Sequence, residues 1–176
     1  APKTIDGDLR NKYIPISFGF DTACRTYAEQ VSNTMVDALA SQKYYHFVRL
    51  MGRAASNIAL EVALQTQPNV CLISEEVEKN NCSLADITKR VAKVIQQRDE
   101  KGKEYGVILL PEGLIEFIPE FSKLIQEMND LMAHDSHNST EDALLANLSA
   151  ENKAVFEYLP HEIRAQLCMD RDPHGN

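Results

Sequence analysis

Apolar side chains recur every four residues in a long stretch near the beginning of the chain. Between Phe18 and Ser41 there is no proline, and no glycine after Gly19, and the repeating positions are Tyr27, Val31, Met35 and Leu39. A period of about four residues places these side chains along one face of a helix. The stretch is therefore predicted to form a long amphipathic helix.

Three short apolar runs interrupt the helical pattern, at residues 45–50, 70–73 and 105–110. Each has the length of a strand, and the run at 70–73 has no polar position, which is typical of a parallel strand with both faces covered. The alternation of strands and helices predicts an α/β fold, in which a parallel sheet carries helices on both faces in three Rossmann-like layers. The helices that accompany the strands are predicted at 53–65, 83–100 and 119–133.

Two sequence features complete the predicted organisation. Ser83 stands three residues before Asp86, which predicts a capping box at the start of the helix at 83–100. From residue 134 onward a polar stretch breaks the pattern, and no fourth strand is predicted. We expect residues 1–133 to belong to an α/β domain that carries a binding site, and residues 134–176 to form a helical extension. Its helical segments are predicted around 144–148, 153–158 and 162–169.

The composition narrows the class of protein. The chain has 176 residues, with 44% hydrophobic and 25% charged positions, which is near the average for soluble globular domains and excludes a disordered chain. Because 18 Lys and Arg face 26 Asp and Glu, the formal charge of −8 argues against nucleic acid as a partner. No run is long enough to span a membrane, and we expect no signal peptide. Four scattered cysteines without a CxxC pair predict reduced thiols in a cytoplasmic protein.

Candidate functional loops follow two of the predicted strands. Met51-Gly52-Arg53 follows the first strand, and Pro111-Glu112-Gly113 follows the third. Ligands of parallel sheets bind at the carboxyl ends of the strands, and a glycine beside an arginine lets backbone amides and a guanidinium approach an anion together. The ordinary alternative is turn chemistry, with a solvated arginine and a glutamate that caps the next helix. The second strand ends in Ser74-Glu75-Glu76.

The opening segment from Pro2 to Leu9 places a cation, a hydroxyl, two carboxylates and a glycine within a few residues. Such density is typical of an active-site loop, in which a carboxylate accepts a proton from an attacking hydroxyl close to phosphate groups. An Asx turn would explain Asp6-Gly7-Asp8 without any chemistry, so both interpretations stay open on this segment alone.

Four motifs in order resemble one enzyme family. They are Pro2 to Leu9, Ser17 to Ala23, Lys43 to Arg53 and Pro111 to Pro119, and the segment from Met169 to Gly175 looks similar as well. The series resembles the pyrophosphate-dependent phosphofructokinases, specifically their long, plant-like and spirochaete-like group. This resemblance implies a phosphofructokinase fold and a reversible, magnesium-dependent transfer of a phosphoryl group from diphosphate to the 1-hydroxyl of fructose 6-phosphate in glycolysis.

The resemblance also implies roles for individual residues. Asp6 would be the general base, and Lys3 would favour diphosphate over ATP as the donor, because its ammonium meets the charge of diphosphate and fills space that a nucleotide needs. Lys43 and Tyr44 would reach into the substrate site of a partner subunit, which implies a homodimer or a higher oligomer. The remaining residues implied to bind fructose 6-phosphate are Thr4, Ile5, Met51, Gly52, Arg53 and Glu112, together with Asp6 itself.

The same resemblance implies that much of the enzyme lies outside this sequence. We expect an interior piece, about a third of a family member, with the glycine-rich diphosphate loop and the magnesium-binding aspartate elsewhere. The piece alone is expected to be inactive, with no metal site of its own and with an exposed sheet edge.

Other interpretations stay open. A phosphosugar-binding, noncatalytic regulatory subunit of the same family would keep the loops at Met51 to Arg53 and at Glu112 without doing chemistry, and an ATP-dependent phosphofructokinase is a further alternative. The pair His134 and His137 has the spacing of metal ligands, although such a polar loop is more often solvated. His46 is expected to be a core or pocket-wall residue rather than a catalyst.

Overall fold

The computed structural model describes residues 5–134 and 141–168, and these fall into two compact units. The first unit ends at Phe117 and the second begins at Ile118. The helix predicted at 119–133 therefore groups with the helical tail, whereas the sequence analysis placed it with the α/β part. The interpretation of the two parts as domains stays a prediction.

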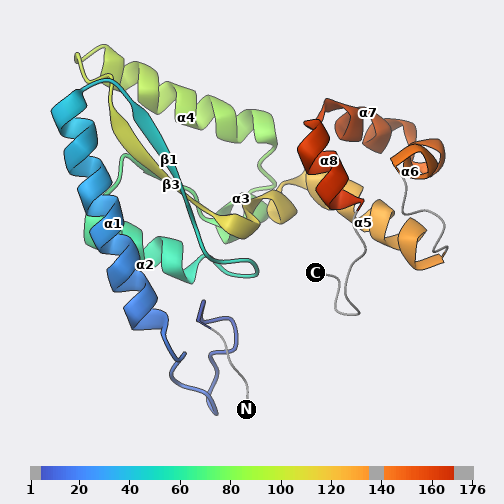
Figure 1. The fold of residues 1–176 in the computed structure, drawn as a ribbon, viewed down its shortest axis with the longest axis horizontal. Coiled ribbons are helices and arrows are strands. Elements are labelled where there is room, and N and C mark those ends of the chain that lie inside the picture. The colour runs from blue at the N-terminus through green and yellow to red at the C-terminus, as the bar shows by residue number, and fades with distance from the viewer. Residues whose placement is uncertain (1–4, 135–140, 169–176) are drawn as a thin grey trace. The chain divides into compact units, whose positions relative to one another are not determined.

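The first unit alternates helices and strands (Figure 1). The helix predicted from the four-residue period is confirmed as the 22-residue α1. The capping box is also confirmed, because the Ser83 hydroxyl accepts from the Asp86 amide and the Asp86 carboxylate accepts from the Ser83 amide, both at 3.1 Å. In chain order the elements are α1 (Phe20–Ser41), β1 (Tyr45–Leu50), α2 (Asn57–Thr66), β2 (Val70–Cys71), α3 (Ser74–Lys79), α4 (Leu84–Asp99), β3 (Gly106–Pro111) and the 3-10 helix η1 (Glu112–Phe117).

The strands form the predicted parallel sheet, in the order β1-β3-β2. β3 pairs with β1 from Tyr45 opposite Gly106 to Leu50 opposite Pro111, and with β2 at Val70 and Cys71. All three strands therefore end at the same edge of the sheet. β1 lies at one side of the sheet, so the expected exposed edge is present among the described strands.

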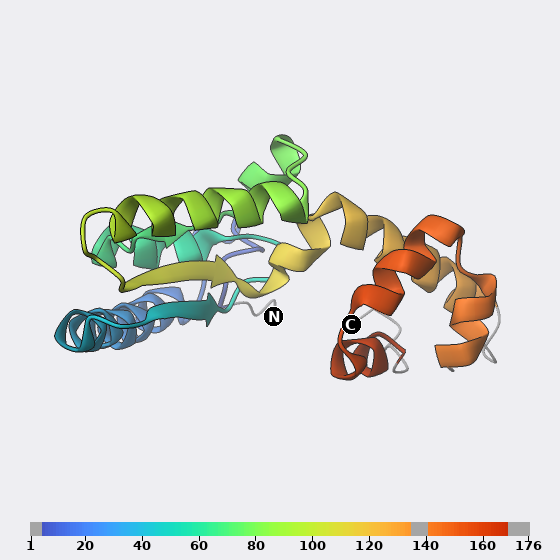
Figure 2. The same cartoon turned by 90° about the horizontal axis from the view of Figure 1, so that it is seen from above.

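The core of this unit lies between the sheet and the first two helices. Leu50 of β1 and Val107 and Leu109 of β3 pack with Val31 of α1 and Ile58 of α2, and all are at most 1% exposed. Side chains alternate between the faces of a strand, so Ile108, also fully buried, points to the opposite face. Figure 2 shows α1 and α4 on opposite sides of the sheet. The α/β fold with helices on both faces is thus confirmed.

Two boundaries differ from the prediction. β2 has only two residues rather than four, because the chain turns at Ile73 and enters the short helix α3, which the sequence analysis did not predict. α2 begins at Asn57 rather than at residue 53. Residues 51–56 instead form a loop, in which Gly52 has a φ of 145° that favours glycine.

In its described residues, the second unit has four helices around its own apolar core. Leu124 and Met128 of α5 are fully buried, as are Leu144 of α6 and Phe156 of α7. The three predicted segments of the tail are confirmed as helices. The bounds are α5 (Pro119–His134), α6 (Glu141–Asn147), α7 (Ala150–Tyr158) and α8 (His161–Leu167).

Polar contacts join the helices of the second unit. The Glu127 carboxylate accepts hydrogen bonds from the amide and hydroxyl of Ser149, at 2.8 and 2.9 Å, just before α7 begins. Arg164 of α8 forms an ion pair with Glu141 of α6 at 2.8 Å. Within the described residues, no helix has both the length and the apolar character needed to cross a membrane.

Candidate active site

The loops that follow β1 and β3 are joined by a backbone hydrogen bond. The Gly113 amide donates to the Gly52 carbonyl oxygen at 2.9 Å. A Cβ atom on Gly113 would collide with the backbone of Arg53, so only glycine permits this close approach. At Gly52 a Cβ would lie 2.7 Å from the carbonyl oxygen of Ala55. The structure therefore brings together the predicted residues Gly52 and Arg53 and the loop that begins with Glu112.

The opening segment lies at the N-terminus of α2. The Asn57 side-chain amide donates to the backbone oxygen of Asp6 at 3.2 Å. Gly7 has a φ of 86°, and a Cβ there would lie 3.1 Å from the same Asn57 nitrogen. Asn57 begins the helix that follows the Arg53 loop. The segment with the predicted base Asp6 is thus hydrogen-bonded to the first residue of α2. The predicted phosphate-binding Arg53 lies in the loop that leads into the same helix.

The pKa of Asp8 depends on charged side chains of three segments, namely Asp6, Arg53 and Glu75. Partial burial raises the pKa of Asp8 above its ordinary value of 3.8, and the neighbouring Asp6 carboxylate raises it further. The Arg53 guanidinium acts in the opposite direction on the pKa of Asp8, and Glu75 adds a smaller upward shift. A guanidinium can bind a phosphate ester, and a carboxylate nearby can accept a proton from a hydroxyl.

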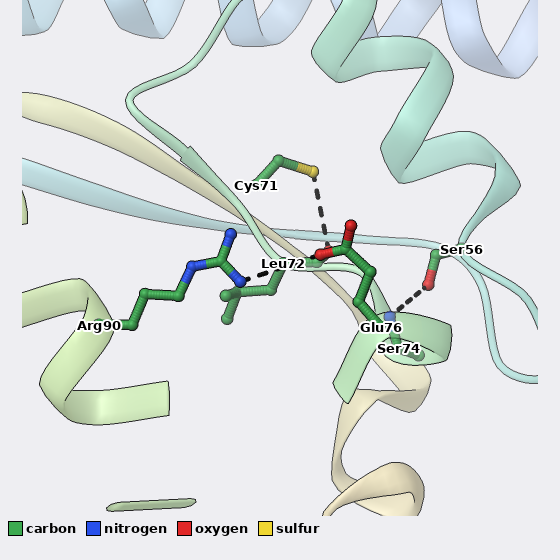
Figure 3. A network of polar contacts seen from close by, with 6 residues as sticks. All are labelled: Ser56, Cys71, Leu72, Ser74, Glu76 and Arg90. Carbon is green, nitrogen blue, oxygen red and sulfur yellow. Dashed lines mark hydrogen bonds and ion pairs between the residues drawn. The ribbon is translucent and has the colours of Figure 1, made fainter. Parts of the chain in front are cut away.

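A third strand end also contributes, through a residue that the sequence analysis did not select. The Glu75 carboxylate accepts a hydrogen bond from the Ser56 amide at 2.9 Å, and the Ser56 hydroxyl accepts one from the Ser74 amide at 2.9 Å. Figure 3 shows the Ser56 to Ser74 contact below the end of β2. The signal available in the sequence was the position of Ser74-Glu75 directly after a predicted strand.

Other predicted site residues lie elsewhere. Lys43 and Tyr44 precede β1, at the opposite end of the strand from Met51, and Tyr44 is 61% exposed. Nearby, the rings of Tyr44 and His46 meet edge to face at 6.5 Å between centroids. Lys3, Thr4 and the loop with His137 fall outside the described residues.

Two further residues of the predicted site, Ile5 and Met51, are partly exposed. Ile5 lies against Gly19, and the side chains of Ile5 and Met51 are 37% and 38% exposed. An open groove of about 840 Å³ has Gly7, Phe20 and Leu60 among its lining residues. We place the candidate site at the strand ends rather than in this groove, because the two segments joined by the Gly113 to Gly52 hydrogen bond are at the strand ends.

Acidic, histidine and cysteine side chains do not gather into a metal-binding cluster in the described parts of the chain. No group of three or more His, Cys, Asp or Glu side chains there could hold a metal ion. All four cysteines are unpaired thiols, and burial raises the pKa of Cys24 to about 11.

Comparison with known proteins decides the family. The family described as Phosphofructokinase matches residues 1–150 of the chain. The chain belongs to the phosphofructokinase family. The phosphofructokinase match covers every residue of the candidate site, from Lys3 to Glu112.

Several relatives of this phosphofructokinase chain carry more specific names. It is 55% identical to a protein from Solanum tuberosum named pyrophosphate--fructose 6-phosphate 1-phosphotransferase subunit beta, over 100% of the chain and 31% of that relative. It is 54% identical to a subunit beta 2 of the same name from Arabidopsis thaliana, with the same coverage. It is also 53% identical to a pyrophosphate--fructose 6-phosphate 1-phosphotransferase from Treponema pallidum, of which it covers 32%. The resemblance found in the motifs is confirmed, and the chain spans about a third of the length of these relatives.

Proposed function

We propose that the full-length protein transfers a phosphoryl group from diphosphate to the 1-hydroxyl of fructose 6-phosphate. The observation that carries this proposal is the convergence of Asp6, Arg53 and the Glu112 loop at the strand ends. The Gly113 to Gly52 hydrogen bond joins two of these segments, and the Asn57 to Asp6 hydrogen bond holds the third. The names of the relatives support diphosphate as the donor.

In this proposal each group has one task. Asp6 accepts the proton of the sugar 1-hydroxyl as that oxygen attacks phosphorus, and the bond to the departing phosphate breaks. Arg53, together with Met51 and Gly52, binds the 6-phosphate, since a guanidinium forms charge-assisted hydrogen bonds with phosphate oxygens. Glu112 accepts hydrogen bonds from sugar hydroxyls, and Thr4 and Ile5 line the same pocket.

The donor side of the reaction rests on residues beyond the described site. Lys3 neutralises diphosphate and excludes a nucleotide, as the motif resemblance implies. Magnesium supplies charge neutralisation on the phosphates when it is bound, and its ligands belong to parts of the protein outside this chain. We also propose a cytoplasmic location, where soluble sugar phosphates are available.

The position of Lys43 and Tyr44 supports a site shared between subunits. β1 has 6 residues, and at about 3.3 Å per residue such a strand spans about 20 Å. Lys43 and Tyr44 therefore lie too far from the Arg53 loop of the same subunit to contact a ligand bound there. We propose that they complete the fructose 6-phosphate site of a second copy in a homodimer or a higher oligomer.

One experiment separates this proposal from its alternatives. The full-length protein is incubated with fructose 6-phosphate and magnesium, with either diphosphate or ATP as the donor, and formation of fructose 1,6-bisphosphate is measured. We expect product with diphosphate and far less with ATP. Binding of fructose 6-phosphate without turnover would instead identify a noncatalytic regulatory subunit, and preference for ATP would identify an ATP-dependent enzyme.

A further inference from the structure

The loop that carries Arg53 is restrained at both of its ends. At its beginning, the Gly52 carbonyl oxygen accepts from the Gly113 amide. At its end, Ser56 is 2% exposed, and its amide donates to the Glu75 carboxylate at 2.9 Å. Arg53 lies between these two points. Its backbone position therefore depends on both contacts.

The second restraint is made by an ionised side chain. Partial burial by itself raises the pKa of Glu75, but the hydrogen bonds with the Ser56 amide, its own amide and the Ser56 hydroxyl outweigh it and bring the pKa below 4.5. Glu75 is therefore a carboxylate at neutral pH. Hydrogen bonds to an ionised acceptor are shorter and roughly twice as strong as neutral ones. Such a bond suits a loop that must stay in one position.

We propose that Glu75 is a positioning residue for fructose 6-phosphate binding, which holds the Ser56 amide and thereby sets the direction in which Arg53 is presented at the strand ends. This inference rests on the proposed function. Glu75 lies beyond the substrate-binding loops, on α3 after the second strand. Its effect on the substrate passes through the loop that ends at Ser56.

The adjacent residue offers a matched control. Glu76 belongs to the same short helix and carries the same side chain, but its carboxylate faces Arg90 of α4 at 3.9 Å (Figure 3). Both side chains of that pair are more than half exposed, at 59% for Glu76 and 58% for Arg90. Exposed pairs of this kind contribute little, so removal of Glu76 changes the charge of α3 without releasing the Arg53 loop.

The test uses the full-length protein with Glu75→Ala, Glu75→Gln, Glu76→Ala and Glu76→Gln. Michaelis constants for fructose 6-phosphate and diphosphate, turnover and thermal midpoints are measured for each. Glu75→Ala is expected to raise the constant for fructose 6-phosphate about tenfold, since a bond to a charged group is lost. Glu75→Gln keeps an acceptor oxygen, so a rise of about threefold is expected. The constant for diphosphate and both Glu76 variants should stay within about twofold of wild type.

The possible outcomes are distinct. If Glu75 and Glu76 variants behave alike, the inference is wrong, while an active wild type leaves the proposed function standing. Equal rises in both Michaelis constants would show a general structural role and would also overturn the inference. If Glu75→Ala does not fold, the comparison of Glu75→Gln with Glu76→Gln decides in the same way. A wild type that does not bind fructose 6-phosphate, measured by calorimetry, removes the proposed function and this inference together.

Discussion

The Gly113 amide donates a hydrogen bond to the Gly52 carbonyl oxygen at 2.9 Å, and this contact joins the ends of two neighbouring strands. It continues the register in which Leu50 lies opposite Pro111. Arg53 and Glu112 therefore belong to loops whose relative position is fixed by backbone atoms. Side chains from separate parts of the sequence can then bind one small ligand.

Substitution of Gly113 should disturb that junction directly. In Gly113→Ala the new methyl group meets the Arg53 backbone, so one loop must move. We expect a loss of about 1–3 kcal/mol in stability, as for other overpacked sites, and a higher Michaelis constant for fructose 6-phosphate. Thermal unfolding and steady-state kinetics of the full-length protein measure the two effects.

Gly102→Ala is the control for this substitution. Gly102, unlike Gly113, has a positive φ, of 67°, and a Cβ there has nothing within 4 Å. An alanine in that conformation costs about 1–2 kcal/mol of stability and should leave the Michaelis constants unchanged. A Gly113→Ala variant with a normal constant for fructose 6-phosphate would show that the junction does not position the substrate loops.

Asp6→Ser tests the proposed general base. Loss of the base should reduce turnover by at least about 10²–10⁴-fold, while fructose 6-phosphate still binds. Asp99→Ser, an exposed aspartate at the end of α4, is the control and should be fully active. Turnover near that of wild type in Asp6→Ser would assign the proton transfer to another group.

Arg53→Ala separates the two ends of the substrate site. We expect the Michaelis constant for fructose 6-phosphate to rise far more than the constant for diphosphate, because a charge-assisted hydrogen bond to phosphate contributes about 1.5–3 kcal/mol. The exposed Arg49, on β1, provides the control in Arg49→Ala. A selective change in the diphosphate constant would mean that Arg53 faces the donor instead.

The pKa of Glu75 predicts how stability depends on pH. Because its hydrogen bonds hold the pKa below 4.5 in the folded state, its contribution is present above pH 4.5 and is lost as the pH falls through the lowered value. Asp8 acts in the opposite direction, since a raised pKa gives a contribution that is lost as the pH rises. Chemical unfolding of wild type and Glu75→Gln, from about pH 7 to about pH 3, should therefore show a stability difference that shrinks on acidification below pH 4.5. A difference that is constant over this range would contradict the assigned hydrogen bonds.

The sequence was sufficient to predict the framework of the first unit. Long apolar periods and short apolar runs specify α1 and the strands because burial of those side chains dominates local structure. Parallel strands place their carboxyl ends at one edge, so the loops at Gly52 and Glu112 could be expected to meet. The end of β2 could not be predicted, because Leu72 still pairs with β3 through its amide while the chain already turns at Ile73.

The contact between Ser56 and Glu75 shows where sequence patterns stop being informative. The two residues are 19 positions apart, and they can meet because β1 and β2 lie parallel on either side of β3 and end at the same edge of the sheet. No local period encodes that strand order. The late start of α2 has a similar cause, since the loop at 51–56 is shaped by Gly113 and Glu75 rather than by its own propensity.

Lys3→Gly tests whether this chain contains the determinant of the phosphoryl donor. The motif resemblance implies that the Lys3 ammonium neutralises diphosphate and fills space that the α-phosphate of ATP would need. We expect the variant of the full-length protein to lose much of its activity with diphosphate and to gain some activity with ATP. Conversion should be incomplete, because the diphosphate loop elsewhere in the protein also limits the space for adenosine. The decisive quantity is the ratio of kcat/KM for diphosphate to kcat/KM for ATP at saturating magnesium, with Lys12→Gly, an exposed lysine shortly after the opening segment, as the control. An unchanged ratio in Lys3→Gly would place the choice of donor wholly outside this chain.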